Sequence, residues 1–104
     1  MKVEIFYFSG CPNYEAAAAR VREVLRQERT DADIVEIEIT DGIAAQEAGF
    51  LGSPTIRVDG QDVELGARMA ATFGLTCRTY VAAGKRCGVP PREWIQAAVR
   101  ELRR

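Results

Sequence analysis

The chain contains no histidine, and this absence removes several kinds of active site. Catalytic Ser–His and Cys–His pairs need an imidazole base, and many transition-metal sites need imidazole ligands. None of these can be built from this sequence. The net charge is only −1, with acidic and basic residues interspersed, so nothing indicates a nucleic-acid partner or an anionic membrane surface.

The sequence also lacks a long apolar run. No stretch is long enough to span a bilayer, and the start, with Lys2 and Glu4 in a strand-like segment, does not read as a secretory leader. We therefore expect a cytoplasmic protein with no membrane partner. The 104 residues, 47% of them hydrophobic and 28% charged, predict a single soluble domain over residues 1–104 with one modest core.

Cysteine is scarce, since the chain has only Cys11, Cys77 and Cys87. An odd number of thiols in a reducing compartment argues against a structural disulfide framework. Redox chemistry, soft-metal binding and inert burial remain as the three alternatives for these residues.

The first cysteine stands where two expected elements meet. Residues 2–8 (KVEIFYF) are rich in β-branched and aromatic residues and predict a buried strand. After Ser9 and Gly10 come Cys11 and Pro12, and apolar residues then recur at helical spacing, with Pro12 suited to the first turn. Unpaired N–H groups at a helix N-terminus favour a thiolate, so we predict that Cys11 is a redox nucleophile. The alternative is a small buried hydrophobic residue.

The rest of the chain predicts alternating strands and helices. Strands are expected at residues 34–39 (IVEIEI), 55–58 (TIRV) and 61–65 (QDVEL), and helices at residues 43–48 and after Pro90-Pro91. Residues 34–39 alternate strictly, which indicates a strand near a sheet edge, and Asp59-Gly60 is a strong hairpin signal. Residues 66–89 read as a long irregular connection of the kind that often forms a functional lid.

The order of elements, the Cys-Pro pair after the first strand and Ser53-Pro54-Thr55 before the third strand together resemble the thioredoxin fold. The whole chain is similar to small bacterial thioredoxin-like and glutaredoxin-like proteins with a Cys-Pro-Asn motif, some of which are labelled as related to alkylmercury lyase. This resemblance implies an α/β fold of order βαβ-α-ββα, with a mixed four-stranded sheet and helices on both faces. It also implies a cis bond before Pro54, with that proline lying against Cys11.

The motif departs from dithiol thioredoxins and glutaredoxins, because their second cysteine would fall at Tyr14. No Gly-Gly-Asp pattern follows Leu65, where glutaredoxins bind glutathione. We expect Asn13 and Tyr14 to line the mouth of the Cys11 site, with core packing as the alternative for Tyr14. The residues expected to bind substrate are Pro12, Asn13, Tyr14, Ser53, Pro54 and Thr55.

The implied fold also places the other two cysteines. The fourth strand ends, and the last helix begins, at the Cys11 end of the sheet, so residues 66–89 would lie over Cys11. Cys77 is the predicted resolving thiol, with Arg78 favouring its thiolate, and the alternative is a cysteine packed under the connection. Cys87 is either a second thiol partner or an exposed cysteine without a role.

These expectations define a thiol–disulfide oxidoreductase that needs no cofactor. The Cys11 thiolate would attack a protein or small-molecule disulfide, and Cys77 or an external thiol reductant would resolve the mixed disulfide. We expect a monomer or weak dimer. Two alternatives stay open: a soft-metal site for Cu, Zn or Hg built from Cys11, Cys77 and Cys87, and a redox-inactive interaction module.

Overall fold

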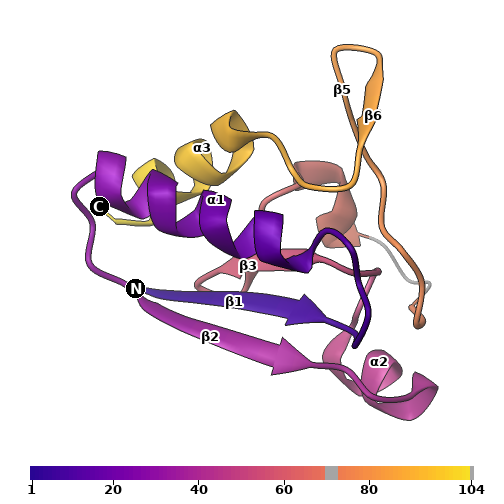
Figure 1. Ribbon diagram of the computed structural model, residues 1–104. Coiled ribbons are helices and arrows are strands. Elements are labelled where there is room, and N and C mark those ends of the chain that lie inside the picture. The colour runs from indigo at the N-terminus through magenta and orange to yellow at the C-terminus, as the bar shows by residue number, and fades with distance from the viewer. Residues whose placement is uncertain (70–72, 104) are drawn as a thin grey trace.

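A mixed four-stranded sheet forms the centre of the protein (Figure 1). The structure is a computed structural model and describes residues 1–69 and 73–103. The strands are β1 (Lys2–Tyr7), β2 (Asp33–Glu38), β3 (Thr55–Val58) and β4 (Gln61–Asp62), in the order β2-β1-β3-β4. β1 pairs parallel with β2 and antiparallel with β3, which in turn pairs antiparallel with β4. β2 therefore lies at a sheet edge, as its alternating sequence predicted.

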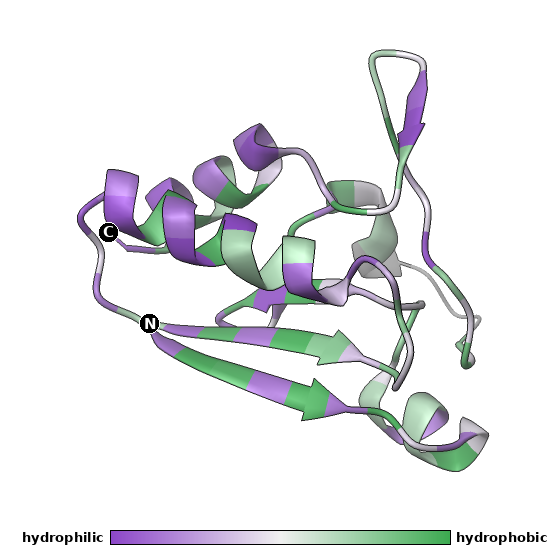
Figure 2. Ribbon diagram, in the orientation of Figure 1, coloured by the Kyte–Doolittle hydropathy of each residue, from purple (hydrophilic) through white to green (hydrophobic). Residues whose placement is uncertain are grey.

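Three helices cover the sheet, and their placement follows the alternation of side chains along β1. Val3 and Ile5 belong to the larger core cluster, which also contains residues of α1 (Tyr14–Gln27) and α3 (Arg92–Leu102). Phe6 points to the other face and packs with Ala45 of α2 (Gly42–Ala48). Figure 1 shows α1 and α3 side by side on one face and α2 on the other, and Figure 2 shows the alternating hydropathy of the strands.

The short helix α2 forms as its local sequence predicts. The Asp41 carboxylate accepts a hydrogen bond from the Ala44 N–H at 2.7 Å, which satisfies one of the free N–H groups at the start of the helix. Gly49 ends the helix in the left-handed conformation, with φ of 65°, where glycine carries no steric penalty.

Of the expected irregular connection at residues 66–89, residues 70–72 lie outside the described part, and the rest contains regular elements that the sequence did not predict. The fourth strand stops at Asp62, and a 3-10 helix, η1 (Leu65–Met69), takes the place of its expected end. A β-hairpin follows, formed by β5 (Tyr80–Ala82) and β6 (Lys85–Cys87), and it projects from the body of the protein (Figure 1). The turn is Ala83-Gly84, with φ values of 52° and 76°, a conformation usually signalled by Asn-Gly or Asp-Gly.

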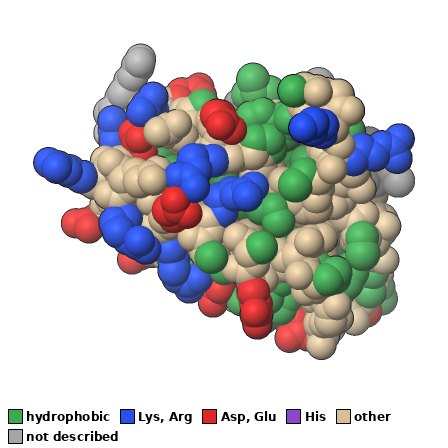
Figure 3. Space-filling model, turned by 45° about the horizontal axis from the view of Figure 1, so that its top comes forward, with side chains coloured by type: hydrophobic (Ala, Val, Ile, Leu, Met, Phe, Trp, Pro, Cys, Tyr) green, Lys and Arg blue, Asp and Glu red, His purple; other side chains and the backbone are tan. Residues whose placement is uncertain are grey.

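The helices α1 and α3 are joined at their C-terminal ends by Glu28. Its carboxylate accepts hydrogen bonds from Arg100 Nε and Gln96 Nε2, each at 2.8 Å, and lies 3.4 Å from Arg103. Charged side chains of both signs intermix over this side of the protein, whereas apolar and uncharged side chains dominate the other side of the same view (Figure 3). Within the described residues, none of the helices has the length and apolar composition needed to cross a membrane.

The Glu28 contacts predict a pH-dependent stability. Hydrogen bonds from Arg100 and Gln96 lower the pKa of Glu28 from its ordinary 4.5 to about 2. The folded pKa lies below the unfolded one, so this stabilisation is complete above about pH 5 and is lost as the pH falls toward 2. We expect urea titrations to show a decline in the free energy of unfolding over this range, and a smaller decline in Glu28→Gln.

The matched control is Glu47→Gln, which removes an exposed carboxylate of α2. This variant should keep the wild-type pH dependence. Parallel pH curves for wild type and Glu28→Gln would contradict the assignment.

Candidate functional site

Cys11 lies in the tight loop that connects β1 to α1. Its N–H donates to the Phe8 carbonyl at 3.2 Å, and its carbonyl accepts from the Tyr14 N–H at 3.5 Å. The residue is half-buried, and its thiol is free. α1 begins at Tyr14, with Asn13 as its N-cap. Pro12 therefore precedes the helix rather than occupying its first turn, and Cys11 stands three residues before the first helical residue.

The Ser53–Pro54 peptide bond is cis, as the resemblance implied. Ser53 connects this turn to the Cys11 loop, because its hydroxyl accepts a hydrogen bond from the Phe8 N–H at 3.4 Å. Ser53, Pro54 and Thr55 are all buried. They are the residues expected to contact substrate, and in this structure another segment of the chain pairs with Ser53.

That segment, residues 73–79, is called the strap below. It runs along residues 50–53: the Gly74 N–H donates to the Phe50 carbonyl at 3.1 Å, and the Ser53 N–H donates to the Thr76 carbonyl at 2.8 Å. The Arg78 N–H then donates to the Ser53 carbonyl at 3.0 Å, which completes a parallel bridge between Ser53 and Cys77. Both backbone polar groups of Ser53 are therefore used by the strap.

Arg78 anchors the strap through a buried ion pair. Its guanidinium donates to both oxygens of Asp62, at 2.7 and 2.9 Å, to Glu64 at 2.9 Å and to the Thr55 hydroxyl at 3.1 Å. The Arg78 and Asp62 side chains are each only 6% exposed. A bidentate, charge-assisted pair of this kind fixes both position and orientation.

Tyr80 extends the same anchor. Its ring packs under the guanidinium of Arg78, with Cζ 4.5 Å from the ring centroid, and its hydroxyl donates to the Pro54 carbonyl. Burial raises the pKa of the Tyr80 phenol well above its ordinary value, so it stays a neutral hydrogen-bond donor. Trp94 meets the Tyr80 ring edge-on at a centroid distance of 6.1 Å.

The two other cysteines lie on different segments, each next to a residue that connects toward the Cys11 loop. Cys77 is exposed on the strap, bridged to Ser53, which itself binds the strand leading to Cys11. Cys87 is exposed on β6, and the next residue, Gly88, lies so close to the Asn13 side chain that a Cβ would not fit. Arg78 does not serve Cys77 as expected, because its guanidinium is buried against carboxylates.

Of the remaining residues predicted to contact substrate, Pro12 lies at the surface and Tyr14 packs against other side chains. Pro12 is exposed beside Cys11. Tyr14 stacks on Tyr7, with ring centroids 3.8 Å apart, and packs against the larger core cluster, which favours the packing alternative. Partial burial, followed by a hydrogen bond to Glu36, raises the pKa of Tyr14 to about 12.

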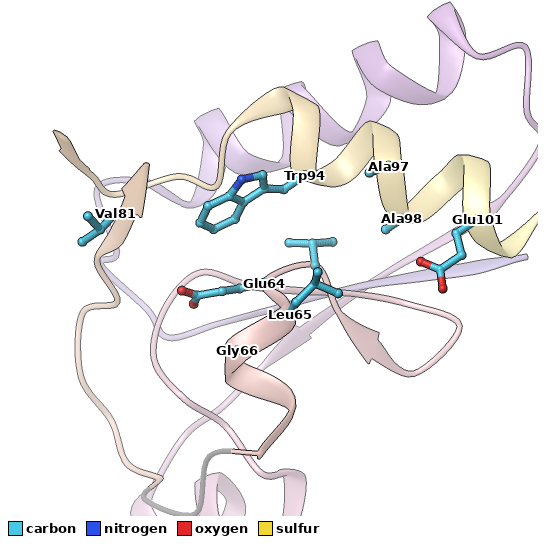
Figure 4. Close-up of a pocket in the computed structure, with 9 residues that line it drawn as sticks. Glu64, Leu65, Gly66, Val81, Trp94, Ala97, Ala98 and Glu101 are labelled. Atoms are coloured by element: carbon cyan, nitrogen blue, oxygen red, sulfur yellow. The ribbon is translucent and has the colours of Figure 1, made fainter. Parts of the chain in front are cut away.

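Two cavities are relevant to ligand binding. One, of about 410 Å³, lies between α3 and the start of η1 and is lined by Leu65, Val81 and Trp94 (Figure 4). Neither this cavity nor the next has a cysteine among its lining residues. The other, of about 390 Å³, is lined by Phe8, Ser9, Glu38, Ile39, Thr40 and Leu75. This second pocket adjoins the Cys11 loop and the strap, and we place the candidate site there.

A three-thiolate metal site is not assembled. In the part of the chain that the structure describes, no group of three or more cysteine, aspartate or glutamate side chains is close enough to hold a metal ion. Comparisons of the chain with protein-family models, with curated proteins and with solved structures return no match. The site must therefore be interpreted from its own geometry.

The Arg78 anchor predicts a large stability difference between two arginine substitutions. Arg78→Met removes the bidentate ion pair to the buried Asp62 carboxylate, which should lower the free energy of unfolding by about 3–5 kcal/mol. Arg86→Met, at an exposed position of β6, should change it by no more than about 0.5 kcal/mol. Urea denaturation of both variants measures the difference, and equal losses would contradict the anchor.

Proposed function

We propose that this chain is a thioredoxin-like thiol–disulfide oxidoreductase in which Cys11 is the nucleophile and Cys77 the resolving thiol. The observation that carries the proposal is the position of Ser53. Its hydroxyl binds the end of the strand that leads to Cys11, while its backbone pairs with the segment that carries Cys77. Two free thiols are thereby held on two segments that meet at one buried residue.

The arrangement of elements supports the fold part of this proposal. A parallel β1–α1–β2 unit is followed by α2, an antiparallel β3–β4 pair and α3, with a cis proline directly before β3. A half-buried cysteine stands between β1 and α1. These are the features on which the resemblance to thioredoxin-like proteins rests.

The reaction proceeds in two exchanges. The Cys11 thiolate attacks one sulfur of a substrate disulfide, a mixed disulfide forms at Cys11, and the other substrate sulfur leaves as a thiolate. Cys77 then attacks the Cys11 sulfur, forms a Cys11–Cys77 disulfide and releases the second substrate thiol. An external dithiol returns two electrons to the protein and leaves as its own disulfide.

Replacing the nucleophile should abolish the first exchange. Reduced protein mixed with bis(2-hydroxyethyl) disulfide and quenched with acid should show the mass of a mixed disulfide, or of an internal disulfide, within a single turnover. Cys11→Ser should slow the reaction to the rate of an ordinary exposed thiol. An unchanged rate in Cys11→Ser would refute the proposed function.

Replacing the resolving thiol should instead trap an intermediate. Cys77→Ser should accumulate the mixed disulfide at Cys11, identified by peptide mass mapping, because the second exchange lacks its thiol. Cys87→Ser is the matched control and should form the Cys11–Cys77 disulfide like wild type. Trapping in Cys87→Ser but not in Cys77→Ser would reassign the resolving role to Cys87.

A further inference from the structure

The backbone of Ser53 is closed to an incoming polypeptide. A peptide substrate that adds to a strand edge needs a free N–H and a free carbonyl on that edge. At Ser53 the N–H already donates to Thr76, and the carbonyl already accepts from Arg78. An extended chain could pair here only after the strap has left.

The strap is held too firmly for easy displacement. Lifting it would break the two Ser53 hydrogen bonds and separate Arg78 from Asp62 and Glu64. Separating a buried ion pair leaves uncompensated charge in the interior, which is strongly unfavourable. Gly52 adds a close fit, because a Cβ at this position would lie 2.9 Å from Arg78 Cβ and 3.0 Å from the Thr76 carbonyl oxygen.

The pocket at the start of the Cys11 loop, lined by Phe8 and Ser9, has the dimensions of a small-molecule site. Its volume of about 390 Å³ falls in the lower part of the range found for ligand pockets. Phe8 and Ile39 supply apolar walls, and Leu75 of the strap, 45% exposed, supplies a third. Ser9, which also lines the pocket, stands two residues before Cys11.

We infer that this pocket binds low-molecular-weight disulfides and that the strap excludes extended polypeptides from the same thiol. This inference rests on the proposed function and narrows its substrate class. The only charged side chain among the lining residues is Glu38, so the pocket favours neutral or cationic disulfides over dicarboxylates. In the exchange, one substrate sulfur forms a disulfide with Cys11 and the other leaves as a thiolate.

The test compares two disulfides with the same leaving group. One is bis(2-hydroxyethyl) disulfide, and the other is an extended peptide of about ten residues whose single cysteine carries 2-mercaptoethanol in disulfide linkage. Single-turnover rates with reduced protein are divided by the rates of N-acetylcysteine with the same reagents, which removes differences in intrinsic reactivity. We expect the normalised rate of the small disulfide to exceed that of the peptide by roughly tenfold or more. This factor corresponds to about two backbone hydrogen bonds that the peptide cannot form at Ser53.

Two glycine variants connect this selectivity to the strap. Gly52→Ala forces the strap away and should bring the two normalised rates closer together. Gly60→Ala is the matched control, because Gly60 also has a positive φ, of 84°, but a Cβ there meets no atom within 4 Å. It should keep the wild-type selectivity. If Gly52→Ala does not fold, the alternative measurement is the hydrogen-exchange rate of the Arg78 amide in the wild-type protein. That amide should stay protected from exchange when the peptide is added.

A second comparison tests the charge of the pocket. Cystamine, a dication, should react faster than dithiodipropionate, a dianion, after the same normalisation, by roughly two- to fivefold. Glu38→Gln should reduce that difference. Equal rates for the two disulfides in wild type would show that Glu38 does not act on the bound disulfide.

The results distinguish the inferred substrate class from the proposed oxidoreductase function. Peptide and small disulfide reacting equally fast at Cys11, or loss of Arg78 protection on peptide binding, would overturn the inference and leave the oxidoreductase intact. An unchanged small-disulfide rate in Cys11→Ser would instead overturn the proposed function itself.

Discussion

The buried pair between Arg78 and Asp62 is the interaction on which the rest of the site depends. Removing two charges from water costs free energy unless each charge has hydrogen-bond partners of opposite charge. Here both Asp62 oxygens accept hydrogen bonds from the Arg78 guanidinium, which also donates to Thr55 and Glu64. Within residues 1–69 and 73–103, no buried side-chain nitrogen or oxygen lacks a hydrogen-bond partner. The pair fixes the strap, and the strap in turn closes Ser53 and carries Cys77.

The two ends of the protein are therefore built on different principles. At the end near Glu28, that largely covered carboxylate binds the exposed side chains of Arg100 and Arg103 and so joins α1 to α3 beside an apolar core. At the Cys11 end, polar groups are buried, and the strap occupies both backbone polar groups of Ser53. The first arrangement stabilises the contact between two helices, whereas the second holds the strap against Ser53.

Local chemistry predicted much of the fold but little of the strap. The Asp41 cap, the Gly49 stop and the edge position of β2 follow from short-range signals in the sequence. The backbone of the strap pairs with Ser53, which is distant from it in the sequence. Such a pairing leaves no periodic pattern of side chains, so the sequence of residues 66–89 predicted an irregular connection. Arg78 looked like a partner for the adjacent Cys77, because sequence proximity is visible and a buried carboxylate at Asp62 is not. The order of elements, and the position of Cys11 between the first strand and the first helix, could be predicted because strand, turn and helix signals adjoin one another.

The exposed side chain of Cys77 sits on backbone that its neighbours hold in place. Thr76 and Arg78 make the hydrogen bonds to Ser53, and the sulfur takes no part in them. The frame of the site is consequently independent of the residue at position 77. If Cys77 acts as the proposed resolving thiol, a change there to another small residue would turn a two-thiol mechanism into a one-thiol mechanism in a single mutational step. The chemistry could then change while the backbone of the strap stays as it is.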